Sequence, residues 1–539
     1  MSKLSKGIFI VLALVLCLAS ACSRSSGTGA ASGTASGGKT LILALSYEPD
    51  TMNVYSTHLL ADVQTCVIEG LIIPNRDMEY VAVLSKEVPT VENGGIVLLN
   101  NGRMDIIYHL QENVKWHDGK PFTSADVKAT WEALKNPHWE AEGKDGVEDI
   151  EDIECPDDLT VICHYKYPVA DYASTLFTFG IMPKHLIEGV DLNEQTGYNR
   201  DGFIGTGPYK FKEWKDGEYI ELVRNTDYWR EGAYMDGMIF KFIPDYNTQI
   251  VQLRTGEIDF AMGIPLDSFS EVSSIRGYKV ESVLLNAWGH LDFNHRNPIL
   301  GTERVVREAI NLCVDKETMC SELLGGLGEP IESYWMNFDY YYNANLPKHE
   351  YNPQKAAQLL DEAGWRLGPD GVRVKNGQRL EFRMIGRTNN IEENKITNVI
   401  EDELKRIGII MNQDLMANSA MSGLRQLGNY DMKMHRWITG SPSRSIFYSN
   451  KAFMPYGVND IWYDNQELSD LLERSDQILN RVERKRMMDE AQLMIYQDVV
   501  SIPIFNYTQL VVHTERLKGF VPNPTNMTHF WNVRAWSLD

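Results

Sequence analysis

The sequence lacks the features that mark nucleic-acid binders and polytopic membrane proteins. Its 539 residues include 52 lysines and arginines against 74 acidic residues, which gives a net charge of −22. Phosphate neutralisation supplies most of the affinity for nucleic acid, so a chain this acidic, with no basic cluster, is not expected to bind it. A 43% hydrophobic, 23% charged composition is that of an ordinary soluble protein. The length predicts several core-sized units.

Motifs for catalysis and metal binding are also missing. There is no GxSxG nucleophile elbow, no HExxH zinc motif and no histidine pair spaced four residues apart. His117 beside Asp118 is best explained as turn chemistry. We therefore predict no catalytic residues, no metal site and no cofactor, and we expect that the protein is not an enzyme.

Cysteine is scarce, with seven residues and no CxxC motif, so a zinc ribbon or thioredoxin-type site has no support. Cys155 and Cys163 flank a predicted turn, and either a disulfide or two free thiols fits this spacing outside the cell. Cys313 and Cys320 fall in predicted helical segments, where core packing is favoured over a bridge.

The first 38 residues predict export and a membrane tether. Lys3 and Lys6 precede an apolar run over 8–18, and small residues then lead to Cys22. This order is typical of a signal peptide over residues 1–21, since eleven apolar residues are too few to span a bilayer, which takes about 20. The site resembles a bacterial lipobox, although Leu18 lies four residues before the cysteine and not three. The resemblance implies that Cys22 is lipidated; simple secretion is the alternative.

Residues 23–38 contain serine, glycine, alanine and threonine with one arginine, and offer nothing to a core. Such a segment behaves as a flexible linker with a reach of roughly 20–25 Å. We therefore expect residues 22–38 to hold an extracytoplasmic domain near a membrane, in the periplasm or on the outer face of the cytoplasmic membrane.

From residue 39 onward, strand-like and helix-like segments alternate, which predicts an α/β fold. Strands are expected at 39–46, 105–116, 209–214, 219–224, 238–243, 258–262, 382–386 and 501–504, and helices at 124–134, 246–255, 305–313, 353–363, 396–407 and twice within 465–498. Residues 148–158 hold seven carboxylates and are interpreted as a solvated surface loop, with a calcium site as the less favoured alternative.

Five ordered blocks of the sequence carry a resemblance to a known family. The blocks are WHDGKPFTSADV at 116–127, GTGPY at 205–209 with NxxYW at 225–229, LxxGEID at 253–259, RVVREAI at 304–310 with Asp315-Lys316, and YNPxKA at 351–356. Together they resemble the oligopeptide- and dipeptide-type solute-binding proteins of ABC importers (family 5). The resemblance covers nearly the whole chain after the signal peptide.

The resemblance implies a two-lobed periplasmic-binding-protein fold (cluster C type) with a two-segment hinge and an extra subdomain inserted in lobe I. By position, lobe I comprises 39–76, 204–288 and 512–539, the inserted subdomain 77–203, and lobe II 289–511. It also implies a monomer that captures a small polar solute, which we expect to be a peptide, between closing lobes and delivers it to an ABC permease. An oligosaccharide binder, an envelope hydrolase and a ligand-presenting signalling protein are the alternatives.

Two positions carry the comparison of ligand residues. Arg387 matches the arginine with which the dipeptide-binding branch grips a peptide carboxylate; a surface arginine paired with Glu392 or Glu393 is the alternative. Trp437 matches a cleft tryptophan that the peptide-binding branch follows closely with an aspartate, whereas here the next carboxylate is Asp460. High affinity for a free peptide amino terminus is therefore not expected. The remaining candidates by position, for which core packing is the alternative, are Tyr47, Trp288, Asn294, Ser441 and Tyr507.

Replacing the predicted lipidation site (Cys22→Ala) should release the protein into the soluble fraction without unfolding it, because the tether lies outside the predicted core. Membrane fractionation with a salt wash, followed by immunoblotting, measures this. A variant that stays with the membrane after the wash would contradict lipidation.

Overall fold

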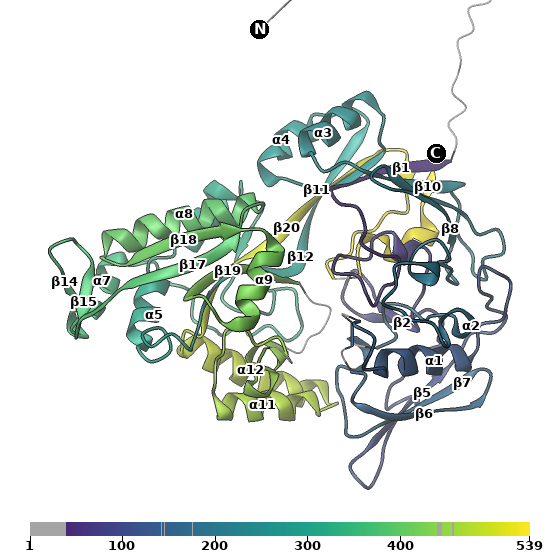
Figure 1. Ribbon diagram of the computed structural model, residues 1–539, viewed down its shortest axis with the longest axis horizontal. Coiled ribbons are helices and arrows are strands. Elements are labelled where there is room, and N and C mark those ends of the chain that lie inside the picture. Colours follow the sequence, from purple (N-terminus) through teal and green to yellow (C-terminus); the bar gives the residue numbers. More distant parts are fainter. Residues whose placement is uncertain are drawn as a thin grey trace, which may run out of the picture. The chain divides into compact units, whose positions relative to one another are not determined.

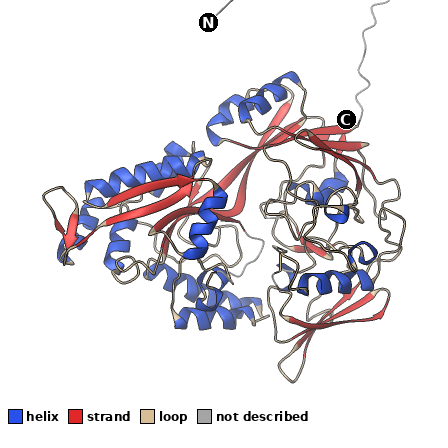
Figure 2. Ribbon diagram, viewed as in Figure 1, coloured by secondary structure: helices blue, strands red, loops and turns tan. Residues whose placement is uncertain are grey.

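The computed structural model describes residues 39–539, apart from residues 142, 145, 175, 439–444, 455, 456 and 526 and the side chains of 445 and 446. The predicted signal peptide, the predicted lipidation site Cys22 and the predicted tether therefore lie outside the described residues. Strands and helices alternate along the described chain, as Figure 2 shows. The predicted α/β class is confirmed.

One large mixed sheet organises the fold. Its strands run in the order β18–β17–β19–β12–β20–β11–β1–β10–β9–β8, and β13 also pairs with β20. In that order they are Ile410–Met416, Glu381–Arg387, Met432–Ile438, Tyr278–Phe293, Ser501–Thr514, Phe260–Ile264, Thr40–Leu45, Gly237–Phe242, Tyr219–Arg224 and Tyr209–Lys215, with β13 at Glu329–Pro330.

The long strands β12 and β20 join the two halves of this sheet (Figure 1). They pair antiparallel over 278–284 with 508–514 and again over 288–292 with 501–506, with register shifts between. Residues 287–293 of β12 also pair with β19. In the other half of the sheet, residues 510–513 of β20 also pair with β11. The expected short strand at 501–504 is thus a 14-residue strand, because its backbone finds partners along its whole length.

The half that begins at β1 follows the predicted pattern. Strand β1 pairs in parallel with β10 and β11, and Leu41 and Leu43 are fully buried. Helix α3 (Tyr246–Thr255) ends at Gly256, whose φ of 74° forms the left-handed cap that glycine favours. The smaller elements here are α4 (Phe269–Ser273), β2 (Ile72–Pro74), β3 (Tyr80–Ala82), β21 (Leu517–Lys518) and β22 (Ser537–Leu538).

Residues 77–203 contain a separate four-stranded sheet in the order β4–β5–β7–β6. Its strands are Ile96–Leu98, Met104–His109, Thr160–Tyr165 and Ile150–Asp157, and α1 (Ser124–Lys135) packs on β6 and β7, with α2 (Lys184–Ile187) beside it. Helix α1 starts with the predicted capping box of Thr123 and Asp126.

Two expectations for this segment were wrong. The acidic stretch 148–158 is largely strand β6 and not a loop, because Ile150 and Ile153 turn inward while the carboxylates stay outside. The strand expected over 105–116 ends at His109.

Four asparagines start the main helices of the other half. The side chains of Asn352, Asn390, Asn465 and Asn480 each accept a bond from a backbone N–H of the first turn. The helices are α5 (Arg304–Asn311), α6 (Lys316–Thr318), α7 (Pro353–Glu362), α8 (Ile391–Arg406), α9 (Asn418–Leu427), α10 (Ser445–Tyr448), α11 (Gln466–Asp476) and α12 (Arg481–Gln497). The short strands are β14 (Arg366–Leu367), β15 (Arg373–Lys375) and β16 (Gln378–Arg379).

All five described cysteines are free thiols. Cys163 lies opposite Ile153 across the β6–β7 pair, and the thiol of Cys155 instead contacts the Ser124 carbonyl at 3.4 Å. The disulfide that the spacing left open is therefore not formed. Cys313 and Cys320 are buried, as expected for core packing.

Within the described part of the chain, no helix combines the length and apolar character that a membrane crossing requires.

Gly289 allows β12 and β20 to pack where their register shifts. A Cβ at this position would lie 2.2 Å from Cε1 of Phe505, whose ring is buried. Gly289→Ala should lower the free energy of unfolding by about 1–3 kcal/mol, the cost of overpacking a core. Denaturant titration measures the change.

Gly423→Ala is the matched control. Gly423 lies inside α9, and a Cβ there would meet nothing within 4 Å. Helix propensity predicts a gain of about 0.5–1 kcal/mol. Equal effects of the two substitutions would contradict the packing argument.

Candidate functional site

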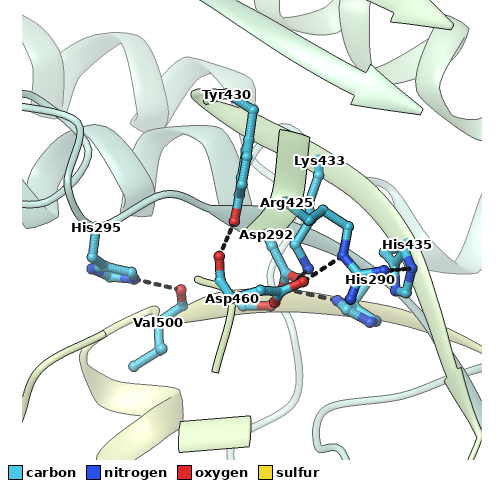
Figure 3. A network of polar contacts seen from close by, with 10 residues as sticks. His290, Asp292, His295, Arg425, Tyr430, Lys433, His435, Asp460 and Val500 are labelled. Carbon is cyan, nitrogen blue, oxygen red and sulfur yellow. Dashed lines mark hydrogen bonds and ion pairs between the residues drawn. The ribbon is translucent and has the colours of Figure 1, made fainter. Parts of the chain in front are cut away.

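A buried network of charged side chains lies at the boundary of β12 and β19 (Figure 3). Its centre is Lys433, which is 0% exposed, with Nζ 2.5 Å from Asp292 Oδ2 and 3.0 Å from Asp460 Oδ1. We call this set the Lys433 network, and its members are His290, Asp292, Arg425, Tyr430, Lys433, His435 and Asp460. A buried ammonium is stable here because two carboxylates compensate it.

Arg425 of α9 completes the balance of charge. Its Nε donates to Asp460 Oδ2 at 2.5 Å, and its Nη1 donates to His435 Nε2 at 3.1 Å. Burial and the adjacent Arg425 charge hold the pKa of His435 well below its usual range, so this imidazole is neutral. Burial acts to raise the pKa of Asp292, but His290 and Lys433 outweigh it and the pKa is lowered.

Two cations, Lys433 and Arg425, thus face two anions, Asp292 and Asp460. These four charges cancel one another, and His290 Nδ1 also lies 2.8 Å from Asp292 Oδ1. Asp460, the first carboxylate after Trp437 in the sequence, is 3% exposed and bonded on both oxygens. It is not available to an ammonium group of a ligand in this conformation.

Trp437 lies beside this network. It is half-buried, its ring centroid is 4.9 Å from that of Phe447, and the Arg425 guanidinium carbon lies 5.1 Å from its centroid. Trp288 is its direct partner across β12 and β19, but Trp288 is 0% exposed and packs against Phe447 and Tyr334. Of these two predicted aromatics, Trp437 retains accessible surface.

Arg387 and Tyr507 meet at a second cluster, centred on Glu393 of α8. The Arg387 Nε donates to Glu393 Oε2 at 3.2 Å and its Nη2 donates to Oε1, while the Tyr507 hydroxyl donates to Oε1 at 2.5 Å. Asn390, which caps α8, donates to the Tyr507 hydroxyl at 3.1 Å. We call these four residues the Glu393 cluster.

Glu393 is 1% exposed, and its carboxylate forms an ion pair with Arg387. The buried negative charge is therefore compensated within the cluster. Burial acts to lower the pKa of Arg387, and the Glu393 charge reverses this and raises it. The sequence suggested both a ligand-binding arginine and an arginine paired with Glu392 or Glu393, and the side chain makes the second contact.

The sequence-based reasoning did not single out Arg436, which sits between His435 and Trp437 on β19. Its guanidinium carbon lies 5.1 Å from the centre of the Tyr507 ring, and it is half-buried. Among the described residues, no carboxylate lies within ion-pair distance of Arg436. Since the Lys433 network and the Glu393 cluster are each balanced, Arg436 supplies a net positive charge. Its position in the sequence, immediately before the candidate Trp437, was the signal that could have identified Arg436 as a further candidate.

The other candidates have local partners. The Tyr47 hydroxyl donates to Asp62, and burial raises the pKa of Tyr47. Asn294 is buried, and its amide nitrogen donates to the carbonyls of Gly428 and Tyr430 at 2.9 and 2.6 Å. Ser441 lies outside the described residues.

Comparison with protein families decides the relationship. The profile described as bacterial extracellular solute-binding proteins, family 5 Middle, matches residues 100–454. The chain belongs to this family. The sequence-based resemblance is therefore confirmed.

Individual relatives of this family 5 chain agree. It is 27% identical over 547 residues to the oligopeptide-binding protein AppA of Bacillus subtilis (strain 168), covering 98% of this chain and 97% of AppA. It is 25% identical over 441 residues to the nickel-binding periplasmic protein of Escherichia coli (strain K12), covering 77% of this chain and 80% of that protein.

Solved structures share the fold. AppA from Bacillus subtilis in complex with a nonapeptide superposes with a TM-score of 0.79 at 25% identity, over 93% of this chain and 99% of that chain. NikZ from Campylobacter jejuni in complex with Ni(L-His) gives 0.80 at 26%, over the same shares. The expected two-lobed binding-protein fold is confirmed, and these relatives are binding proteins and not enzymes.

Removing the central cation tests the Lys433 network. Lys433→Met should lower the free energy of unfolding by about 3–5 kcal/mol, because the buried Asp292 and Asp460 would lose the ammonium that they share, and Arg425 pairs with Asp460 and not with Asp292. Denaturant titration at pH 7 measures the loss.

Lys451→Met is the control, since Lys451 forms an exposed pair with Glu473 at 62% side-chain exposure. Such surface pairs contribute at most about 1 kcal/mol. A similar small loss for both variants would contradict a compensated buried network.

Proposed function

We propose that this family 5 protein is a lipoprotein, tethered through Cys22, that captures a peptide between two closing lobes and delivers it to the permease of an ABC importer. The observation that carries the ligand class is Arg436, whose guanidinium lies over the Tyr507 ring and has no carboxylate at ion-pair distance among the described residues. A cation next to an aromatic surface suits a peptide, which offers a terminal carboxylate and side chains. The relative AppA, solved with a nonapeptide, supports the same reading.

We infer that residues 39–76, 204–288 and 512–539 form lobe I, and that residues 289–511 form lobe II. In support, β12 and β20 are the strands that cross these proposed boundaries. Residues 77–203, which hold the separate sheet β4–β5–β7–β6, would be the inserted subdomain. A pair of crossing strands would serve as the two-segment hinge.

Two arginines are candidates for the ligand carboxylate. Arg387, the residue that the family resemblance suggests, already uses Nε and Nη2 on Glu393. Engaging a ligand with those atoms would leave a buried carboxylate without its partner. Arg436 has no such obligation, so we assign it the carboxylate and assign Arg387 the role of holding Glu393 and Tyr507 in place.

Neither described carboxylate of these two clusters that could receive the ligand's amino terminus, Asp460 or Glu393, is free. Asp460 is occupied by Arg425 and Lys433, and Glu393 by Arg387 and Tyr507. Recognition of the peptide would therefore rest on its carboxylate and on aromatic contact with Trp437.

The decisive measurement is calorimetric titration with a pentapeptide, its acetylated twin and its carboxy-amidated twin, chosen from a pentapeptide pool by ultrafiltration and mass spectrometry. Arg436→Ala and amidation should each weaken binding by about 1.5–3 kcal/mol, the range for hydrogen bonds to charged groups. Acetylation should change the affinity little.

Arg436→Lys is the conservative variant and should recover only part of the affinity, because an ammonium lacks the planar fork. A larger loss of peptide affinity for Arg387→Ala than for Arg436→Ala would show that Arg387, and not Arg436, binds the ligand carboxylate. If no peptide of the pool binds to the protein but a neutral oligosaccharide does, the oligosaccharide-binding alternative replaces the peptide-binding proposal.

A further inference from the structure

A separate cavity of about 250 Å³ lies in the half of the structure that contains β2 and β3. It shares no lining residue with the Lys433 network or the Glu393 cluster. Its walls come from four stretches of chain: 65–83, 178–179, 208–230 and 527–535. Most of the lining is apolar, with Ile68, Ile73, Val83, Phe179, Met527 and Val533 among the side chains.

Two arginines interrupt the apolar wall. Arg230 and Arg534 both line the cavity, and both are half-buried. Arg534 donates one bond to the backbone carbonyl of Glu231 at 2.9 Å, and the Arg230 guanidinium carbon lies 5.2 Å from the centre of the Trp229 ring. Over the described chain, neither guanidinium has a carboxylate at ion-pair distance. Because arginine does not lose its proton in proteins, both remain charged.

The single acid in the lining, Glu69, offsets at most one of these two charges: burial raises the pKa of its carboxyl group, and the Arg230 charge is among the influences that oppose the rise. Its Oε1 accepts from the Tyr228 hydroxyl at 2.6 Å, and its Oε2 accepts from Trp229 Nε1 and Thr206 Oγ1, both at 3.0 Å. These neutral donors hold the carboxyl group in place. Two positive charges against at most one negative charge leave the cavity with a net positive charge.

The volume limits the size of an occupant. By comparison with a cavity of about 150 Å³ that accommodates benzene, 250 Å³ holds roughly ten non-hydrogen atoms. Water is a poor filling, because an ordered water needs two to four polar partners and this lining is largely apolar. An apolar body with one anionic end matches both parts of the wall.

We propose that this cavity binds a small monocarboxylate with an apolar chain of medium length, whose carboxylate lies between Arg230 and Arg534 and whose chain fills the space among Ile68, Val83 and Phe179. This site is additional to the peptide site, and the proposal does not depend on the identity of the transported solute.

Octanoate, with ten non-hydrogen atoms, is the probe, and 1-octanol is its uncharged twin. Calorimetric titration of the soluble protein, below the concentration at which octanoate forms micelles, should show one site for octanoate. Octanol should bind at least tenfold more weakly, since it cannot use the two guanidinium groups. Equal affinity for the two probes would overturn the assignment of the arginines.

Two variants place the site. Arg230→Gln combined with Arg534→Gln should weaken octanoate binding at least tenfold. Both side chains are half-buried and glutamine keeps a hydrogen-bond donor at each position, so circular dichroism should show an intact fold. Arg436→Gln should leave octanoate binding unchanged. The proposal fails if octanoate does not bind, if the double variant binds it like the unmodified protein, or if Arg436→Gln abolishes binding, which would place the carboxylate at the peptide site.

Discussion

The antiparallel pairing of β12 with β20, in two stretches separated by register shifts, is the constraint on which the rest of the structure depends. These two strands run through both halves of the large sheet, so each half inherits its position from the same pair of backbones. The register shifts near Gly289 lie where the ladder passes from one half to the other. If the proposed hinge lies here, a two-stranded connection would restrict the relative motion of the halves to bending and twisting about the pair. That restriction is what a binding protein with two lobes requires, because closure must bring the same surfaces together each time.

Charge compensation determines which groups near β19 can meet a ligand. Lys433 and Arg425 are paired with Asp292 and Asp460, and Arg387 is paired with Glu393. Buried pairs contribute little net stability relative to apolar residues, but separating one is costly, so the pairs act as fixed parts of the wall. The charge that remains is that of Arg436, which has no carboxylate at ion-pair distance among the described residues. The proposed ligand site is therefore cationic, although most of the charged groups around it cancel.

The same contrast holds for the whole molecule. The chain carries a net charge of −22, yet both candidate sites are locally positive. The overall field repels anions at long range and is screened by salt within about 10 Å, whereas a partly buried guanidinium acts at contact distance. An acidic surface with cationic recesses thus favours ligands that present a carboxylate to a specific place and disfavours non-specific binding of polyanions.

The sequence by itself determined the fold class, the family and most of the elements. Periodicity and capping residues located α3, α7 and the strands from 209 to 262, because these depend on local interactions. The five ordered blocks identified the family, whose profile matches residues 100–454. Tertiary structure decided the rest. The acidic run at 148–158 became strand β6 because neighbouring strands offered it partners, and Trp288 became part of the core because Phe447 packs on it from 159 residues away. Above all, the availability of Arg387, Arg436 and Asp460 could not be read from the sequence, since whether a charge is free depends on which distant side chains surround it.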